Sequence, residues 1–316
     1  MVADEVLRTG ETDCQALLAE LVEALSPRPA AGSGTRRPAG EGEGEGTELG
    51  RFVLPTVDWW RDRLFGGMVV AQALAAAGET VDPALVPHSM HGYFFRPVVP
   101  GSSTELVVED VRNSRTFATR EVTTSQNGKV CARMTASFLV EEKGADEYQL
   151  PLPPGTPLPE QLVEVYPPGP FASCDAGPLL DPEDGGGEDG GPVYRSSGRF
   201  WNRTCGHLPD DPRLHAGVLA LMSDMTRASF RPGTMDRWGS HTDASIDHAV
   251  WFHRPARPDD WLLFDLCAVV NTANRAAVRG AMYRRDGALV CSMAQELLIR
   301  PLPGGGELAP WVAARP

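Results

Sequence analysis

The 316-residue chain is 42% hydrophobic and 22% charged, a composition that excludes a wholly disordered chain and a membrane bundle. Its length fits one large domain or two of moderate size. The formal net charge is −13, but many of the acids lie in two Gly-rich stretches, GEGEGEGTE and DPEDGGGEDGG, so the remainder is close to neutral. Acidic stretches of this kind disfavour nucleic acid as a partner.

The apolar runs are too short to span a membrane, and the N-terminal residues, MVADEVLRTGETDC, lack a basic region followed by an apolar one. We therefore expect a cytoplasmic protein without a membrane partner. The six cysteines show neither a CxxC pair nor metal-ligand spacing, which predicts reduced thiols, no zinc site and no disulfide framework. They are Cys14, Cys131, Cys174, Cys205, Cys267 and Cys291.

Two compact blocks are separated and flanked by segments of low complexity. In chain order we expect an N-terminal helix and linker, a first block, a linker with an acidic Gly-rich segment, a second block and a tail, at residues 1–48, 49–143, 144–196, 197–302 and 303–316. Leucines at helical spacing predict the first helix at Asp13–Leu25. Ser26–Gly46 and the segment around Pro182–Pro192 are expected to be mobile, because neither buries enough apolar area to offset its ordering entropy.

The two blocks resemble each other in sequence. Arg254-Pro255 follows Arg96-Pro97 by 158 residues, and the turn Asp286-Gly287 follows Asn127-Gly128 by 159. Such constant spacing indicates an internal duplication. Asn-Gly and Asp-Gly between alternating apolar residues also predict hairpins, since both residues tolerate positive φ.

Each block begins with an apolar helix, predicted at Gly67–Thr80 and at His215–Ala228. Several strands follow each helix, and a helix that is apolar around most of its circumference is expected inside a curved antiparallel sheet. This pattern predicts an α+β fold of two similar units. Because sheet edges tend to pair, a homo-oligomer is also expected.

Several stretches resemble the type II acyl-CoA thioesterases, the thioesterase II group: RLFGGMVVAQAL, HSMHGYFFRP, QNGKVCARMTASF, GHLPDDPRLHAGVLALMSD, SIDHAVWFHRP and DGALVCSMAQE. The resemblance covers both blocks. It implies a double hotdog fold, with each long helix wrapped by an antiparallel sheet. It also implies hydrolysis of an acyl-CoA or acyl-carrier-protein thioester, with coenzyme A present only as part of the substrate and with no metal or other cofactor.

In that family a water molecule is activated by an Asp on the second helix, a Ser or Thr before an Ile-Asp-His-like strand, and a Gln on the last strand. The matching residues are Asp224 in MSDM, Ser245 in ASIDH and Gln295 in MAQE. The resemblance therefore implies a catalytic trio in the second block.

The duplication supports this trio independently. The first-block counterparts of the three residues are all nonpolar: Leu74, Pro87 and Ala136. A buried polar group without a partner costs about 1–3 kcal/mol, so a polar cluster confined to one copy indicates a site that uses it.

The first helix starts with Gly66-Gly67-Met68, where the family commonly has Gly-Gly-Gln. The N–H groups of Gly67 and Met68 are candidates for binding the substrate or a developing oxyanion, because helix N-termini present free donors. A close-packed helix entry explains the glycines almost as well. His248 and His253 flank Trp251 in an aromatic-rich strand and are interpreted as structural.

Two alternatives to hydrolysis remain open. Hotdog folds also carry acyl-thioester hydratases, which typically pair an Asp with a His five positions later; here that position is Ser229. The second alternative is a non-catalytic protein that binds acyl thioesters. Fold alone does not choose among these functions.

Overall fold

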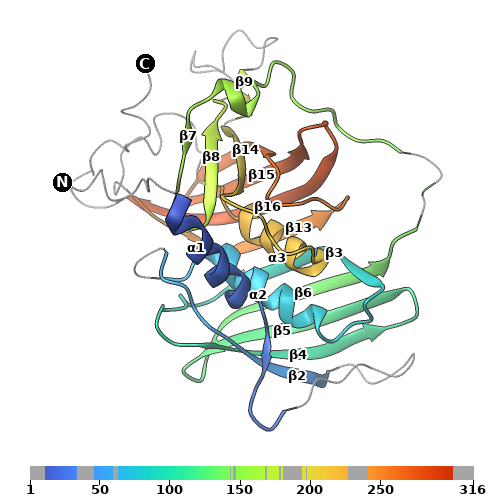
Figure 1. Cartoon of the computed structure of the whole chain (residues 1–316). Coiled ribbons are helices and arrows are strands. Elements are labelled where there is room, and N and C mark those ends of the chain that lie inside the picture. The colour runs from blue at the N-terminus through green and yellow to red at the C-terminus, as the bar shows by residue number, and fades with distance from the viewer. Residues whose placement is uncertain are drawn as a thin grey trace.

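The structure is a computed structural model of the 316-residue chain (Figure 1). It describes residues 11–33, 46–59, 63–142, 144, 147–167, 169–177, 179–180, 194–196, 198–226 and 241–301. The helices are α1 (Glu11–Ala24), α2 (Gly66–Gly78) and α3 (Pro212–Ser223), with a 3-10 turn at Pro159–Gln161.

The first unit contains five main strands: β2 (Thr47–Leu54), β3 (Leu85–Phe94), β4 (Thr104–Asn113), β5 (Phe117–Gln126) and β6 (Lys129–Val140). The second contains β11 (Gly198–Thr204), β12 (His241–Ser245), β13 (Asp247–Phe252), β14 (Leu262–Thr272), β15 (Arg275–Arg284) and β16 (Leu289–Pro301). The remaining strands are short: β1 (Arg28–Pro29), β7 (Glu164–Val165), β8 (Phe171–Asp175), β9 (Leu179–Leu180) and β10 (Tyr194–Ser196).

One antiparallel sheet runs through both units. Its central order is β2-β4-β5-β6-β3 followed by β13-β16-β15-β14-β11, so the second unit repeats the strand order of the first in reverse. In each unit the helix lies between the first and second strands of the chain order, and α2 and α3 pack against each other. The expected α+β double hotdog fold is confirmed.

The junction of the units follows the repeat closely. On the β3–β13 ladder His91 pairs with Ala249, which lies 158 residues later, the same spacing that separates the repeats. His91 and Ala249 occupy equivalent positions in the two repeats. A local twofold axis that relates the two units therefore passes beside this pair. Ser89 pairs with Trp251 and Tyr93 with Asp247, as this symmetry requires.

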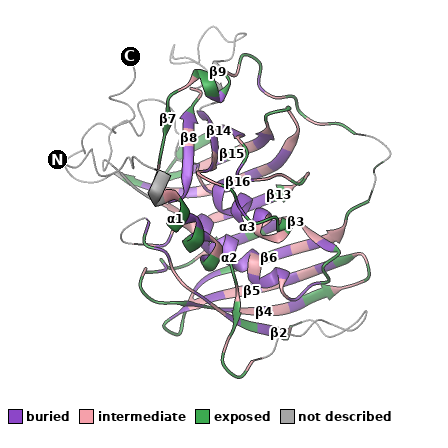
Figure 2. Cartoon of the chain, viewed as in Figure 1, coloured by how far each residue is buried: buried purple, intermediate pink, exposed green. Residues whose placement is uncertain are grey.

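The helices fill the space enclosed by the sheet. Every residue of α2 except Gly66 and Ala75 is buried, and Figure 2 shows most of α2 and α3 in the colour of buried residues. Helix α3 starts where Asp211 caps it, accepting a hydrogen bond from the Arg213 N–H at 2.9 Å, and Pro212 occupies the first helical position. Burial of these apolar helix faces stabilises the contact between the two units, which the β3–β13 ladder also joins.

Helix α3 ends earlier than the sequence predicts. The pattern extends the helix to Ala228, but α3 ends at Ser223 and Asp224 is its C-cap residue. The chain then leaves the helix through Met225 and Thr226, which are described, before residues that are not. Helix α2, predicted at Gly67–Thr80, ends at Gly78.

The expected linkers contribute strands where they are described. Within Ser26–Gly46, which the sequence predicts to be mobile, Arg28 and Pro29 pair with Val53 and Phe52, so the prediction is wrong for this part. Residues 34–45 lie outside the described residues. Strand β8 pairs with β11 and β7 pairs with β8, which extends the second sheet into the segment assigned to the linker at 144–196. The acidic segment around Pro182–Pro192 lies outside the described residues.

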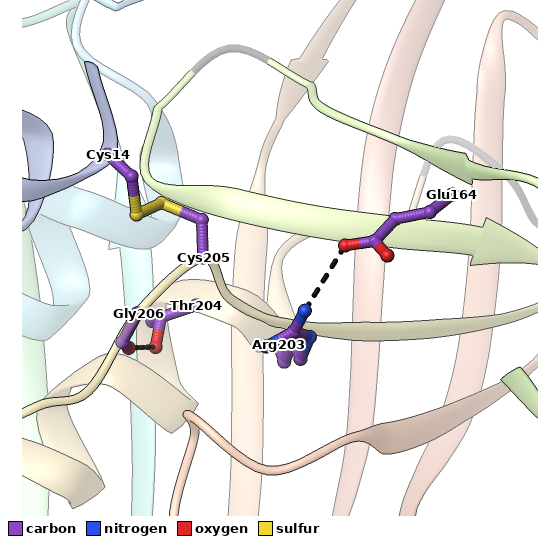
Figure 3. The surroundings of a disulfide bond; sticks show 6 residues. All are labelled: Cys14, Glu164, Arg203, Thr204, Cys205 and Gly206. Atoms are coloured by element: carbon purple, nitrogen blue, oxygen red, sulfur yellow. Dashed lines mark hydrogen bonds and ion pairs between the residues drawn. A yellow bond between two sulfur atoms is a disulfide. The ribbon is translucent and has the colours of Figure 1, made fainter. Parts of the chain in front are cut away.

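A disulfide joins Cys14 of α1 to Cys205, which follows β11, with Cα atoms 5.9 Å apart (Figure 3). The prediction of reduced thiols is therefore wrong for this pair. The two residues are 191 positions apart and meet because α1 packs onto the α3 side of the molecule, with Leu18 against Gly206. The other four cysteines are free.

The outer edges of the described sheet are β1 and β7, each two residues long and exposed. Short edge strands, one of which contains Pro29, protect a sheet against pairing with another chain. The oligomer expected from sheet edges stays a prediction. Among the described helices, none is long and apolar enough to cross a membrane.

Candidate active site

Asp224, Ser245 and Gln295 lie together, although 21 and 50 residues of sequence separate them. Ser245 Oγ donates to Asp224 Oδ1 at 3.1 Å, and Gln295 Nε2 donates to Ser245 Oγ at 2.7 Å. Gln295 Nε2 also donates to Asp224 Oδ1 in a short contact. The three predicted side chains therefore form one hydrogen-bonded cluster.

Three different elements bring these side chains together. Asp224 caps α3, Ser245 ends β12, and Gln295 lies near the middle of β16. Side chains alternate along β16, so Gln295 faces inward with Met293 and Leu297, which are both buried. Only 5% of Asp224 and 4% of Gln295 is exposed, so water reaches the cluster over a small surface.

The hydrogen bonds around Asp224 have a fixed direction. A carboxylate oxygen can only accept, so both the Ser245 hydroxyl and the Gln295 amide donate to Oδ1. Two donors on one oxygen stabilise the ionised carboxylate. A general base requires that ionised form of the carboxylate.

The start of α2 lies directly against this cluster. A Cβ on Gly66 would stand 2.7 Å from Asp224 Oδ2, and a Cβ on Gly67 would overlap the Leu221 carbonyl oxygen of α3. Both positions therefore need glycine for close approach. Because α2 presents its positive N-terminal end here, it also offsets the negative C-terminal end of α3 beside Asp224.

Gly67 and Met68 differ in what they can offer a substrate. The Met68 N–H donates to the Phe65 carbonyl at 3.0 Å, and the Met68 side chain is completely buried. Met68 is therefore already engaged in the helix start and the core. Gly67 lies beside the cluster, and binding of an oxyanion by its N–H stays a prediction.

Two family models match most of this chain. One, described as the acyl-CoA thioesterase N-terminal domain, matches residues 56–139, and the other, described as acyl-CoA thioesterase, matches residues 186–298. Acyl-coenzyme A thioesterase 8 of Homo sapiens is 30% identical over 282 residues, which cover 78% of this chain and 83% of that protein. Acyl-CoA thioesterase 2 of Haemophilus influenzae is 31% identical over 263 residues, covering 75% and 88%.

The chain belongs to the type II acyl-CoA thioesterase family. Solved structures agree. The acyl-CoA thioesterase II TesB2 from Mycobacterium marinum superposes with a TM-score of 0.71 at 31% identity, covering 90% of this chain and 99% of that one. The tesB protein of Mycobacterium avium subs paratuberculosis gives a TM-score of 0.68 at 28% identity, covering 90% and 100%.

Thr226 joins the cluster in this member of the thioesterase family, and the sequence did not predict it. Its Oγ1 donates to Gln295 Oε1 at 2.6 Å, and only 1% of the residue is exposed. The duplication also marks Thr226, because the helix alignment that places Asp224 against Leu74 places Thr226 against the nonpolar Ala76.

His248 is completely buried and contacts Ser223, the residue before Asp224. Its Nε2 lies 2.6 Å from Ser223 Oγ, and Ser223 Oγ donates to the Ala220 carbonyl at 2.7 Å. The histidine Nε2–H therefore donates to the serine. Burial lowers the pKa of His248 to about 4, so the ring is neutral at pH 7 and ties the end of α3 to β13.

Substituting His248 by Met, the residue that Met90 supplies in the first unit, is expected to change how stability depends on pH. The folded-state pKa of about 4 lies below the ordinary value of 6.5, so protons bind the unfolded chain more strongly as pH falls between these values. Because of this histidine, the free energy of unfolding of the parent should fall by about 2 kcal/mol when the pH is lowered from 7.5 to 5.

Urea unfolding of the parent and of His248→Met at both pH values measures this cost. The parent should lose more free energy of unfolding than the variant by that amount, whatever the two stabilities are at pH 7.5. Equal losses in the two proteins would show that His248 does not titrate as a buried neutral histidine.

Proposed function

We propose that the chain hydrolyses acyl-CoA thioesters to a free acid and coenzyme A, with Asp224 activating the attacking water. The hydrogen-bonded cluster of Asp224, Ser245 and Gln295 carries this proposal. The first unit has Leu74, Pro87 and Ala136 at the equivalent positions, so the fold itself does not require the polar groups. Family membership supports the same reaction.

In the proposed step, water attacks the thioester carbonyl carbon while Asp224 takes its proton. A C–O bond forms and the carbonyl oxygen becomes an oxyanion. The intermediate then expels the thiolate of coenzyme A as the C–S bond breaks, and the proton held by Asp224 passes to the thiolate. Water and the carboxylate balance this reaction, so the proposal includes no metal and no cofactor beyond the coenzyme A of the substrate.

Ser245 and Gln295 orient the carboxylate, and through it the water. General-base assistance contributes roughly 10²–10⁴-fold to the rate. Donors placed where an oxyanion develops contribute further, and the N-terminus of α2 at Gly67 is the proposed donor because it lies beside Asp224.

The thioester carrier is proposed to be coenzyme A, with an acyl-carrier protein as the alternative carrier. A panel of acyl-CoA and acyl-carrier-protein substrates, followed with a reagent for free thiols, tests both. Release of thiol together with free acid supports hydrolysis. Binding without release would favour a non-catalytic acyl-thioester-binding protein, and a hydrated or dehydrated thioester would favour a lyase. A cytoplasmic location and a homo-oligomer also stay predictions.

Ser245→Ala and Gln295→Ala are each expected to lower kcat by about tenfold, because each removes one donor to the carboxylate, worth about 1–1.5 kcal/mol. The loss should be smaller than that from removing the base. Ser292→Ala is the matched control, since Ser292 also lies on β16 but contacts His253 on the other face. Steady-state kinetics on one good acyl-CoA substrate measures all three. Unchanged kcat in both cluster variants would contradict their role.

A further inference from the structure

We infer that Thr226 is a positioning residue that fixes the orientation of the Gln295 amide and thereby keeps Asp224 ready to accept a proton. The orientation of the Gln295 amide is argued from the hydrogen-bond geometry. The expected effect on kcat rests on the proposed function.

The orientation of a glutamine amide depends on its neighbours, because the oxygen and nitrogen ends have nearly the same shape. The Gln295 Nε2 end faces Asp224 Oδ1 and Ser245 Oγ, and both contacts need a donor. The Oε1 end faces Thr226 Oγ1, which donates at 2.6 Å. Asp224 can only accept, so it requires the amino end of the amide, and Thr226 supplies the donor for the carbonyl end that this orientation presents.

A reversed amide would place its carbonyl oxygen against the carboxylate of Asp224. Two acceptors in contact repel each other, and Asp224 Oδ1 would lose one of its donors. The protonated acid would then be favoured, since it alone could donate to the reversed carbonyl. A general base that holds a proton cannot take one from water.

The early end of α3 is what brings Thr226 to this position. After Asp224 the chain leaves the helix, with Met225 N–H donating to the Met222 carbonyl at 3.0 Å and Thr226 N–H to the Asp224 carbonyl at 2.8 Å. The equivalent Ala76 of α2 stays inside its helix. The tight turn directs the Thr226 hydroxyl toward β16, where Gln295 lies.

The first unit contains a second Thr–Gln pair that serves as a control. Thr104 Oγ1 donates to Gln72 Oε1 at 3.1 Å, and Gln72 Nε2 donates to the Ala24 and Pro55 carbonyls at 3.1 and 2.8 Å. Both partners are completely buried. This pair ties α1 and α2 to the sheet and touches none of the proposed catalytic groups.

The test compares Thr226→Val, Thr226→Ser and Thr104→Val with the parent. Thr226→Val keeps the shape but removes the donor, so kcat should fall about tenfold with KM nearly unchanged. The acidic limb of the kcat/KM profile should also move to higher pH. Thr226→Ser restores a hydroxyl and should stay within about twofold of the parent. Thr104→Val should lower the melting temperature and leave kcat and the pH profile unchanged.

A second readout does not depend on activity. In ¹⁵N-labelled protein the side-chain amide of Gln295, assigned by its loss in Gln295→Ala, should exchange slowly with solvent in the parent and in Thr226→Ser. It should exchange faster in Thr226→Val. If the parent hydrolyses no acyl-CoA, the proposed function fails while this readout still decides the orienting role.

The inference would be overturned by a parental kcat and pH profile in Thr226→Val, by an equal loss of activity in Thr226→Val and Thr226→Ser, or by unchanged exchange of the Gln295 amide in Thr226→Val. A fall in kcat without movement of the acidic limb would also contradict it, because a merely structural role predicts that pattern.

Discussion

Asp224→Asn is expected to lower turnover by roughly 10²-fold or more while leaving the fold intact. The amide occupies the same volume, and its oxygen still accepts from Ser245 Oγ and Gln295 Nε2. It cannot take a proton from water at neutral pH. The change therefore removes the base and little else.

Asp211→Asn is the matched control for this variant. Asp211 caps the other end of the same helix, where Asn is an equally good cap residue, so kcat and melting temperature should match the parent. Thermal unfolding of both variants establishes that they are folded. Parental turnover in Asp224→Asn would show that the base lies elsewhere in the chain.

Breaking the Cys14–Cys205 disulfide is expected to cause the largest loss of stability of any single change proposed. A cross-link between residues 191 apart restricts the unfolded chain strongly, and such bridges typically contribute about 2–4 kcal/mol, rising toward about 5 for long loops. The bridge holds α1, whose Leu21 and Ala24 are completely buried against the rest of the core.

Cys14→Ser and Cys205→Ser should each lower the free energy of unfolding by about this amount, as should a reductant added to the parent. The two substitutions together should cost little more than either alone, because one bond is lost. Cys267→Ser, at a free cysteine, is the control and should leave the stability nearly unchanged. Free-thiol titration that finds six reactive thiols in the unfolded, unreduced protein would contradict the bridge.

The duplication explains why the fold could be predicted from one sequence. The spacing of 158 residues between the Arg-Pro pairs recurs as the pairing of His91 with Ala249 at the junction of the units. Periodicity and turn chemistry act locally, so they are visible in the chain. Even so, the two turns differ: Asn127 and Gly128 both have positive φ, whereas in the second turn only Gly287 does.

The features that the sequence did not predict depend on tertiary contacts. Strand β8 is short and forms because β11 offers it a partner, and Cys14 meets Cys205 only after α1 has packed. Apolar periodicity extends the second helix through Thr226, but α3 ends at Ser223, and its C-cap residue Asp224 is hydrogen-bonded within the cluster. The trio was therefore predicted residue by residue, whereas the residue that orients it was not.

A single-turnover reaction in H₂¹⁸O, with enzyme in excess over an acyl-CoA, tests whether water attacks the thioester directly. Direct attack by a water that Asp224 activates predicts one ¹⁸O atom in the released acid and none in the protein. Mass spectrometry of the acid and of the peptide containing Asp224 measures both. Label in Asp224 would show that the carboxylate attacks the thioester itself, and absence of released acid would show that the chain does not hydrolyse the substrate.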